Sequence, residues 1–397
     1  MSWQHRLHSK LQQRRDQHLW RQRSVLNSPQ DAHVDCNGET LVNFCSNDYL
    51  GLAASGGEDL ATAARRWQFG SGASHLVCGH SRAHHALEDA LAELTGYPRA
   101  LLFSTGYMAN IGAISALAQR GDRVIQDKLN HASLLDGAIL SRADLQRFRH
   151  ADYEHLADLL NKDDARGETL VVSDSLFSMD GDLADVPQLS RLCEQTGSLL
   201  MIDDAHGFGV LGENGGGVRE HFGLTTQQLP VYVGTLGKAL GGYGAFVAGS
   251  NDLIDYLIQF ARPYIYTTAL PPAVAEAMLG NLERLKDNAR RQQLKARIQQ
   301  FRSGAEQMHL PLMDSQSPIQ PLLIGESAKA ISVSNELRTR GLWVSAIRPP
   351  TVAEGSARLR VTLSAAHSED DVKRLLDALS AIWQNDNTLP RASEQVL

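Results

Sequence analysis

A single lysine stands in a glycine-rich and otherwise uncharged run, GTLGKALGGYG, at residues 234–244. A lysine among glycines suits two kinds of chemistry, because its ammonium can hold a phosphate and its neutral amine can attack a carbonyl. The phosphate loop G-x-x-x-x-G-K-[ST] needs a glycine at 232 and a hydroxyl at 239, where this chain has Tyr232 and Ala239. The sequence therefore argues against a nucleotide-phosphate loop at Lys238.

A carboxylate and a histidine follow an apolar run in LLMIDDAHG, at residues 199–207. The apolar run predicts a buried strand, which places Asp203 near its carboxyl end in a partly dry setting. A carboxylate there needs a cationic partner. A lone aspartate at a strand end is usually structural, but Asp203 and His206 are followed by Thr235 and Lys238 at the end of the next predicted strand. That combination is much rarer and points to a site.

Pyridoxal phosphate would use these residues together. Its aldehyde requires a lysine that can lose its proton, and the apolar surroundings of Lys238 favour the neutral amine. Its ring nitrogen requires a carboxylate, for which Asp203 is the candidate. His206 is placed to reach the ring hydroxyl, and His131 is a candidate for stacking on the ring face.

The phosphate of the same cofactor would need backbone N–H groups at a helix start together with hydroxyls. Gly106 and Tyr107 follow a predicted strand and open a helical pattern, directly after Thr105. Thr235 stands three residues before Lys238 and adds a second hydroxyl.

The elements that must position these residues are short apolar runs alternating with helical patterns, from about residue 84 to 280. The predicted strands are 99–105, 121–127, 168–175, 197–205, 230–236 and 243–249. This alternation predicts an α/β fold with a mostly parallel sheet and helices on both faces. Ligands of such sheets bind beyond the carboxyl ends of the strands, where the candidate residues fall.

The chain of 397 residues is long enough for two or three domains of roughly 150 residues. We expect an N-terminal helical segment (1–45), a large α/β domain that binds the cofactor (46–280) and a small α+β domain (281–397). Trp3, Leu7 and Leu11 recur every fourth residue in a basic segment, which predicts an amphipathic helix packed on the body.

Composition excludes several classes of protein. The net charge of −7 argues against a broad nucleic-acid surface. No run approaches the ~18 apolar residues of a membrane span, and no secretory signal is evident. The four cysteines are scattered and indicate neither a zinc site nor a disulfide framework. The sequence thus predicts a cytoplasmic protein.

Two further patterns are interpreted as structural. GFGVLG (207–212) matches the dinucleotide fingerprint, but the following ENGGG is a poor helix start. His80, His84 and His85 lie close together, but they open an amphipathic helix and lack obvious further ligands. The sequence therefore predicts no metal site.

Long blocks over nearly the whole chain resemble the α-oxoamine synthases, which are fold-type I pyridoxal-phosphate enzymes. The blocks are NFCSNDYLGL, GSGASHLVCGHSRAHHALEDALAEL, HASLLDGA, FSMDGD, DDAHGFGVLGENGGG, GTLGKALGG, IYTTALPP and GSARLRVTLSAAH. The resemblance implies a decarboxylative condensation of an amino acid with an acyl thioester, in a homodimer with active sites at the subunit interface.

Within that family, the stretch IRPPTV and the N-terminal segment favour the member that joins L-alanine to a pimeloyl thioester, carried by coenzyme A or by acyl-carrier protein. The alternatives are a member that joins glycine to acetyl-CoA, another α-oxoamine synthase, or a non-catalytic binding protein of the same fold. His75 and Ala353 depart from the family pattern, where arginine and proline are common.

The resemblance also implies roles for individual residues. Lys238 resembles the lysine that bonds to the cofactor aldehyde, and Asp203 resembles the partner of the ring nitrogen. His131 resembles the stacking residue. The residues that resemble other cofactor contacts are His206 and Ser178 at the ring hydroxyl, Gly106, Tyr107 and Thr235 at the phosphate, and Thr267 or Thr268 at the phosphate of the neighbouring subunit.

The substrate contacts come from the same resemblance. Asn47 and Arg360 fit the amino-acid end, where the guanidinium of Arg360 would clamp the carboxylate. Arg21 and Thr351 match positions near the acyl substrate. Arg358, two residues from Arg360, is interpreted as a surface residue of the strand.

Overall fold

The computed structural model describes residues 2–17, 19–162 and 166–392. Within these residues, thirteen strands form three sheets, and the largest sheet has seven of them. Its strands, in spatial order, are β3 (Arg99–Phe103), β9 (Ala245–Gly249), β8 (Val231–Thr235), β7 (Leu199–Asp203), β6 (Thr169–Asp174), β4 (Arg123–Asp127) and β5 (Asp144–Phe148). The six strands predicted in this region are therefore confirmed.

The largest sheet is mostly parallel, as predicted. β4 to β8 pair in parallel, while β9 is antiparallel to both β8 and β3. The sequence prediction missed β5, whose residues DLQRF lie at the sheet edge and are largely solvent-accessible. An edge strand of this kind has no apolar run to reveal it.

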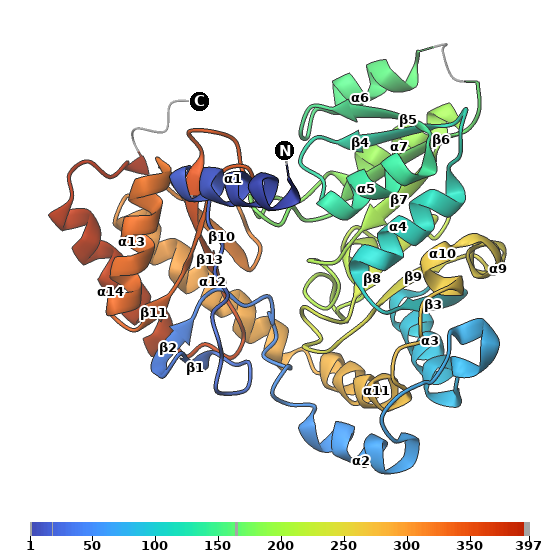
Figure 1. Ribbon diagram of the computed structural model, residues 1–397, viewed down its shortest axis with the longest axis horizontal. Coiled ribbons are helices and arrows are strands. Elements are labelled where there is room, and N and C mark those ends of the chain that lie inside the picture. Colours follow the sequence, from blue (N-terminus) through green and yellow to red (C-terminus); the bar gives the residue numbers. More distant parts are fainter. Residues whose placement is uncertain (1, 18, 163–165, 393–397) are drawn as a thin grey trace.

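Helices cover both faces of this sheet (Figure 1). The side chains of β8 show why, because they point alternately to the two faces of the sheet. Val231 and Val233 belong to the apolar cluster on one face, and Tyr232 belongs to the cluster on the other face. The first face carries α4 (Gly106–Leu117), α5 (Ala132–Ser141), α9 (Asn251–Phe260) and α10 (Arg262–Ile265). The other carries α3 (Arg82–Thr95), α6 (Tyr153–Leu160), α7 (Val186–Thr196) and α11 (Pro272–Lys286).

The C-terminal part contains two small sheets, drawn on the left of Figure 1. One is antiparallel and consists of β10 (Ile319–Gly325), β13 (Ala357–Thr362) and β12 (Ser345–Ile347). The other consists of β1 (His33–Cys36), β2 (Glu39–Asn43) and β11 (Leu342–Trp343). The helices of this part are α12 (Ala289–Gln307), α13 (Ser327–Thr339) and α14 (Glu369–Asn385).

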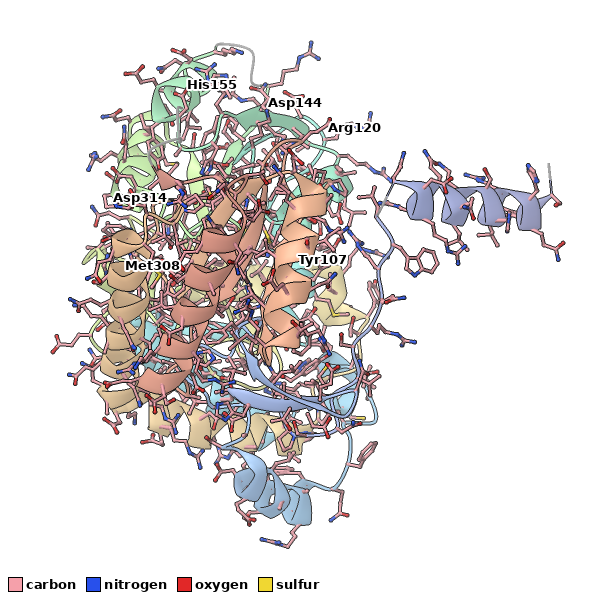
Figure 2. The ribbon with its side chains drawn as sticks, turned by 90° about the vertical axis from the view of Figure 1, so that its left-hand side faces the viewer. Tyr107, Arg120, Asp144, His155, Met308 and Asp314 are labelled. Atoms are coloured by element: carbon pink, nitrogen blue, oxygen red, sulfur yellow. The ribbon has the colours of Figure 1, made fainter. Side chains whose placement is uncertain are left out.

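The N-terminal segment differs from the expectation of a helical region packed on the body. Helix α1 (Trp3–Asp16) has no buried residue, and Figure 2 shows it projecting from the body. Residues 33–36 and 39–43 instead form the antiparallel strands β1 and β2, and β2 also pairs in parallel with β11. The proposed division into domains stays a prediction.

The remaining helices connect these parts. They are α2 (Gly57–Trp67), which packs on α11, the π-helical turn η1 (His75–Gly79) and the short α8 (Val218–His221). No long helix follows GFGVLG, in agreement with the rejection of a dinucleotide fingerprint there. Among the described residues, no helix has the length and apolar character needed to cross a bilayer.

Candidate active site

Lys238 lies in a tight turn beyond the carboxyl end of β8. The N–H of Gly241 donates to the Lys238 carbonyl at 2.8 Å, and that glycine has φ +64°. A Cβ on Gly241 would stand 2.2 Å from the backbone nitrogen of Ala53, and one on Gly242 would stand 2.0 Å from the sulfur of Met278. The glycines around Lys238 are thus required by the fold of the turn itself.

The electrostatic environment of Lys238 favours loss of its proton. Burial lowers the pKa of this amine to about 8, although the carboxylates of Asp203 and Asp174 oppose the shift. Burial, together with the charge of Asp203, raises the pKa of Asp174 well above its usual value. The amine is therefore partly neutral near pH 8 and can act as a nucleophile or base.

Asp203 ends β7 and is held by two donors. Its Oδ2 accepts from the Asn110 amide at 2.6 Å, and its Oδ1 accepts from the Ala205 N–H at 2.9 Å. The Asn110 amide also donates to the Ser133 hydroxyl at 2.9 Å, which lies 2.7 Å from Nδ1 of His131. This chain of contacts links α4, α5 and β7 and fixes the carboxylate at the sheet edge.

His131 caps the amino end of α5. Its backbone N–H donates to Asp174 at 2.7 Å, and its ring meets that of Tyr107 edge-on at 6.3 Å. The ring is exposed rather than packed into the core. His131 is thus accessible to solvent next to Tyr107, at the amino end of α4.

His206 is buried and belongs to a second polar chain. Its Nδ1 lies 2.5 Å from the hydroxyl of Tyr49, which is 3.3 Å from Oδ1 of Asn47. Burial and the charges of Lys238 and Arg360 lower the pKa of His206 well below its usual value, so the ring is neutral near pH 7. Burial raises the pKa of Tyr49 to about 12, so its hydroxyl keeps its proton.

Arg360 reaches this chain from β13 in the C-terminal part. Its Nη2 donates to Oδ1 of Asn47 at 3.1 Å, and its Nε donates to the carbonyl of Ser178 at 2.6 Å. Arg360 is 7% exposed, and a buried guanidinium needs such acceptors. The structure therefore brings Asn47, Ser178, His206 and Arg360 together from distant parts of the sequence.

Arg358 corrects an expectation. It was expected at the surface, but it is 5% exposed and pairs with Asp180 at 2.5 Å. Asp180 follows Ser178 in the same turn, so Arg358 and Arg360 both hold the segment after β6. Strand alternation explains the error: both arginines share one face of β13, and both side chains on that face contact the segment that follows β6.

The amino end of α4 and the turn after β8 lie face to face. The Thr105 side chain caps α4 by accepting from the N–H of Met108 at 3.2 Å. A Cβ on Gly106 would lie 3.9 Å from the Thr235 hydroxyl. Tyr107 is 42% exposed and donates its hydroxyl to Asp136. The N–H groups that open α4 thus lie next to the Thr235 hydroxyl, which itself donates to the Gly244 carbonyl at 3.1 Å.

The other predicted residues lie in two separate cavities. Thr267 and Thr268 line one of about 670 Å³, together with Ser104 and Phe69. Arg21 and Thr351 line a smaller one of about 150 Å³. Within a single chain, the structure does not bring these four into the polar chains around Lys238.

Sequence reasoning missed three residues that organise the site, Tyr49, Asn110 and Ser133. Asn110 is a polar residue inside the apolar helix GYMANIGAISAL, which was the available signal. Tyr49 carried no signal, because its partner His206 is distant in sequence.

The family model for class I and II aminotransferases matches residues 39–379 of this chain. The 8-amino-7-oxononanoate synthase of Pseudomonas fluorescens is 61% identical over 377 residues, covering 94% of this chain and 96% of that protein. That of Pseudomonas savastanoi is 59% identical over 381 residues, covering 95% and 96%.

Solved structures agree with this assignment. The serine palmitoyltransferase of Sphingomonas wittichii superposes with a TM-score of 0.92 at 29% identity, covering 98% of this chain and 100% of that one. The 8-amino-7-oxononanoate synthase of Francisella tularensis has a TM-score of 0.76 at 32% identity, covering 87% and 98%. The predicted fold-type I architecture is thus confirmed, and the chain belongs to the class I and II aminotransferase family of pyridoxal-phosphate enzymes and, within it, to the 8-amino-7-oxononanoate synthases, acyltransferases of biotin biosynthesis.

Proposed function

We propose that this chain condenses L-alanine with a pimeloyl thioester, releasing carbon dioxide and the free thiol and giving 8-amino-7-oxononanoate. The observation that carries the proposal is the position of Lys238, whose pKa is lowered to about 8 at a sheet edge shared with Asp203 and His206. Membership of the family supports the choice of substrates, since relatives near 60% identity bear that product's name.

The residues present fit pyridoxal phosphate. One buried polar atom of the network, Oδ1 of Asn110, has no partner among the described residues and adjoins the carboxylate of Asp203. The backbone N–H groups at the α4 amino end suit a phosphate, and Thr235, whose hydroxyl donates to the Gly244 carbonyl, lies beside them. When bound, the cofactor supplies an electron sink for the carbon that loses its proton.

Lys238 would bond to the cofactor and, once displaced by the amino group of L-alanine, take the proton from the α-carbon of that substrate. A neutral amine is required for both tasks, and burial provides it. Asp203 would accept a hydrogen bond from the ring nitrogen. Its two donors, Asn110 and the N–H of Ala205, fix the orientation of the carboxylate.

His131 would stack on the ring face, and His206 and Ser178 would contact the ring hydroxyl. Because the pKa of His206 is lowered, its neutral ring can donate or accept one hydrogen bond without adding charge. The contact to Tyr49 fixes one ring nitrogen and leaves the other for the cofactor side.

Arg360 and Asn47 would orient the substrate carboxylate. The guanidinium already donates to Asn47, so the side chains of Arg360 and Asn47 are held in place before the substrate carboxylate binds beside them. The carboxylate held there is the group that is lost after the new carbon–carbon bond forms. Arg21 and Thr351 would contact the acyl chain or its carrier.

We also propose a homodimer, in which Thr267 and Thr268 reach the cofactor phosphate of the partner subunit. Large apolar side chains are exposed beside them, with Phe69 98% and Tyr266 70% accessible in the single chain. A patch of this kind is typical of a protein–protein interface. The free state of all four cysteines supports a reducing, cytoplasmic location.

A panel of purified holoenzyme with alanine, glycine or serine and pimeloyl, acetyl or palmitoyl thioesters tests the proposal. We expect release of thiol and carbon dioxide with alanine and pimeloyl thioester, measured in the same reaction. Turnover confined to glycine and acetyl-CoA would contradict the substrate choice. Including pimeloyl-CoA and pimeloyl-acyl-carrier protein separates the two possible carriers.

A further inference from the structure

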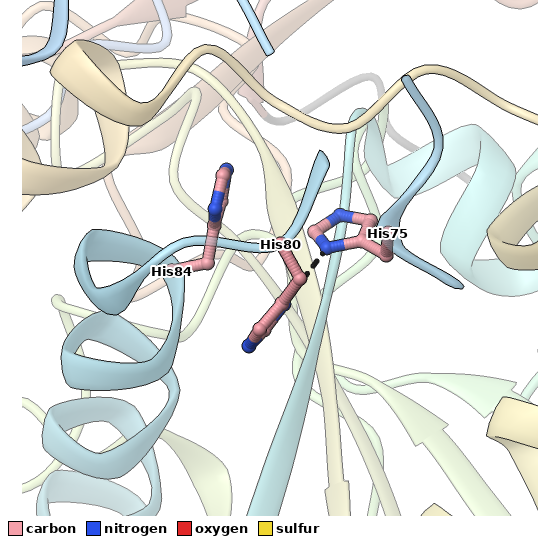
Figure 3. Close-up of side chains that lie close together, drawn as sticks. All are labelled: His75, His80 and His84. Atoms are coloured by element: carbon pink, nitrogen blue, oxygen red, sulfur yellow. Dashed lines mark hydrogen bonds between the residues drawn. The ribbon is translucent and has the colours of Figure 1, made fainter. Parts of the chain in front are cut away.

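Three histidines come together outside the active site (Figure 3). The Nδ1 atoms of His75 and His80 share a hydrogen bond at 3.0 Å. Both ring nitrogens of His84 are also occupied, since one accepts from the Ser81 N–H at 2.9 Å and the other donates to the Leu270 carbonyl. Hydrogen bonds alone therefore explain this cluster.

Asp174, in contrast, is a buried acid with no role in the reaction proposed above. It ends β6, is 6% exposed and is the register partner of Asp203 on β7. Partnered residues of parallel strands point to the same face of a sheet, so the two carboxyl groups lie side by side at the carboxyl end of the strands. Two acids thus stand where only Asp203 has a partner on the cofactor.

The contacts of Asp174 tie the start of α5 to the end of β6. Its Oδ2 accepts from the backbone N–H of His131 at 2.7 Å, and its own N–H donates to Oδ1 of Asn130 at 3.0 Å. The amide nitrogen of Asn130 donates to the Val172 carbonyl at 2.9 Å. Three hydrogen bonds therefore hold residues 130 and 131 against β6, and they fix where the His131 ring can lie.

A negative charge on Asp174 has little support from its neighbours. Among the described residues, a single donor reaches its carboxyl group, and that donor is a neutral backbone N–H. Burial and the charge of Asp203 raise the pKa of Asp174 well above its usual value, and Asp127 on β4 adds to the shift. Lys238 opposes the shift only while the lysine carries its proton. Adjacent buried acids of this kind ionise one at a time.

We propose that Asp174 is a positioning residue, which as a neutral acid fixes His131 and places no second negative charge beside Asp203. The carbonyl oxygen of a neutral carboxyl group can still accept from the His131 N–H. The inference rests on the proposed stacking of His131 on the cofactor ring. It does not depend on which amino acid or thioester the enzyme uses.

Asp174→Asn tests the protonation state. The new amide is neutral, has nearly the same shape and keeps an oxygen for the N–H of His131. We expect cofactor affinity and kcat within about twofold of the wild type, and an unchanged pH at which the absorbance of the bound cofactor changes. A displacement of that pH by about one unit or more would show that Asp174 is charged and would overturn the proposal.

Asp174→Ala tests the positioning, because it leaves the N–H of His131 without its acceptor. We expect about tenfold lower kcat and about tenfold weaker binding of pyridoxal phosphate, titrated into the cofactor-free enzyme by fluorescence. Asn130→Ala removes the other hold on the same segment and should act in the same direction, which keeps the test decisive if Asp174→Ala does not fold. Asp144→Asn, at an exposed position of β5, is the control and should change neither quantity.

The three variants together decide between the roles. Wild-type affinity in both alanine variants would overturn the positioning of His131. An asparagine variant as impaired as Asp174→Ala would overturn the neutral form, because a merely structural neutral acid is replaced by its amide without loss. Turnover with another substrate pair would contradict the proposed reaction and leave the cofactor titration unchanged.

Discussion

At the residue scale, the proposed chemistry depends on Lys238, whose pKa is lowered by burial, and on the carboxylate of Asp203, which is held by two hydrogen-bond donors. In the sequence, this chemistry was indicated by Lys238, which is the single charged residue of a glycine-rich run. The structure adds that its pKa is lowered to about 8 while Asp203 and Asp174 oppose the shift. Burial lowers the pKa of the amine and the two carboxylates raise it. Part of the amine is therefore neutral at neutral to mildly basic pH.

Lys238→Ala should abolish turnover, because no other side chain is proposed to bond to the cofactor or to move the α-proton. We expect at least about a 1000-fold loss in kcat, since both nucleophilic and proton-transfer catalysis are removed. Thiol release with alanine and pimeloyl thioester measures it. Lys128→Ala, at an exposed lysine, serves as the control. A Lys238→Ala enzyme with substantial activity would refute the assignment.

Asn110→Ala tests the support of Asp203. Removing the amide takes away the 2.6 Å donor to Oδ2, so the carboxylate is oriented less firmly. We expect about a tenfold lower kcat with little change in KM. Ser115→Ala on the same helix, whose hydroxyl bonds only within α4, should change neither. A loss in Tm with an unchanged kcat would indicate a structural role alone.

At the scale of elements, the site depends on turns that join the sheet to the residues it presents. The turn after β8 admits only glycine at two positions, and the turn after β6 is held by the arginines of β13. Such contacts cannot be read from local periodicity, because each partner comes from another element. The sequence nevertheless predicted where the turns fall, since apolar runs end there.

Gly241→Ala should destabilise the fold and the site together. The new Cβ would meet the backbone of Ala53 at 2.2 Å, and the residue would keep φ +64°. We expect a loss of about 2–4 kcal/mol in the free energy of unfolding, from backbone strain and overpacking. Urea denaturation measures it. Gly57→Ala, where a Cβ meets nothing within 4 Å, is the control and should change stability little.

His150 connects the end of β4 to the turn near β6 through Asp127 and Asp182. Burial works against its charge, but hydrogen bonds to these two carboxylates raise the pKa of His150 to about 10. Because the folded pKa exceeds the unfolded value of about 6.5, this stabilisation is complete below pH 6.5 and is lost as the pH rises through 10.

His150→Gln should therefore lower the free energy of unfolding by about 2 kcal/mol at pH 6. The difference from the wild type should shrink as the pH approaches 10, in urea denaturation at several pH values. His221→Gln, at an exposed position, provides the control. A difference that stays constant over this pH range would contradict the ion-pair explanation.

At the scale of the whole molecule, a single chain leaves two features unexplained. Phe69 and Tyr266 are exposed beside Thr267 and Thr268, and helix α1 projects from the body with Trp3 73% accessible. A proposed second copy would cover the apolar side chains near Thr267. The cavity there would then be completed by both subunits.

Replacing Phe69 and Tyr266 together by glutamate should weaken dimerisation by at least about tenfold, because two apolar anchors become charged. Sedimentation at several protein concentrations measures the association, and activity should fall with the dimer fraction. Phe260→Glu replaces an exposed phenylalanine of α9 and should leave association unchanged. A monomeric wild type with full activity would refute both the interface and the shared phosphate contact.

The sequence by itself determined the α/β class and six of the strands in the large sheet, and it singled out the lysine that we propose as the reactive one. These follow from local signals, since an apolar run of a few residues predicts a buried strand and a lone charge among glycines stands out. Asp203 and His206 were found because they end such a run.

The tertiary structure decided what those residues contact. It joined Arg360 to Ser178 and Asn47, linked Asp203 through Asn110 and Ser133 to His131, and gathered His75 with His80 and His84. None of these pairings has a signature in one stretch of chain. Each depends on how elements far apart in sequence pack, because burial and strand order, rather than spacing, set which polar groups must satisfy one another.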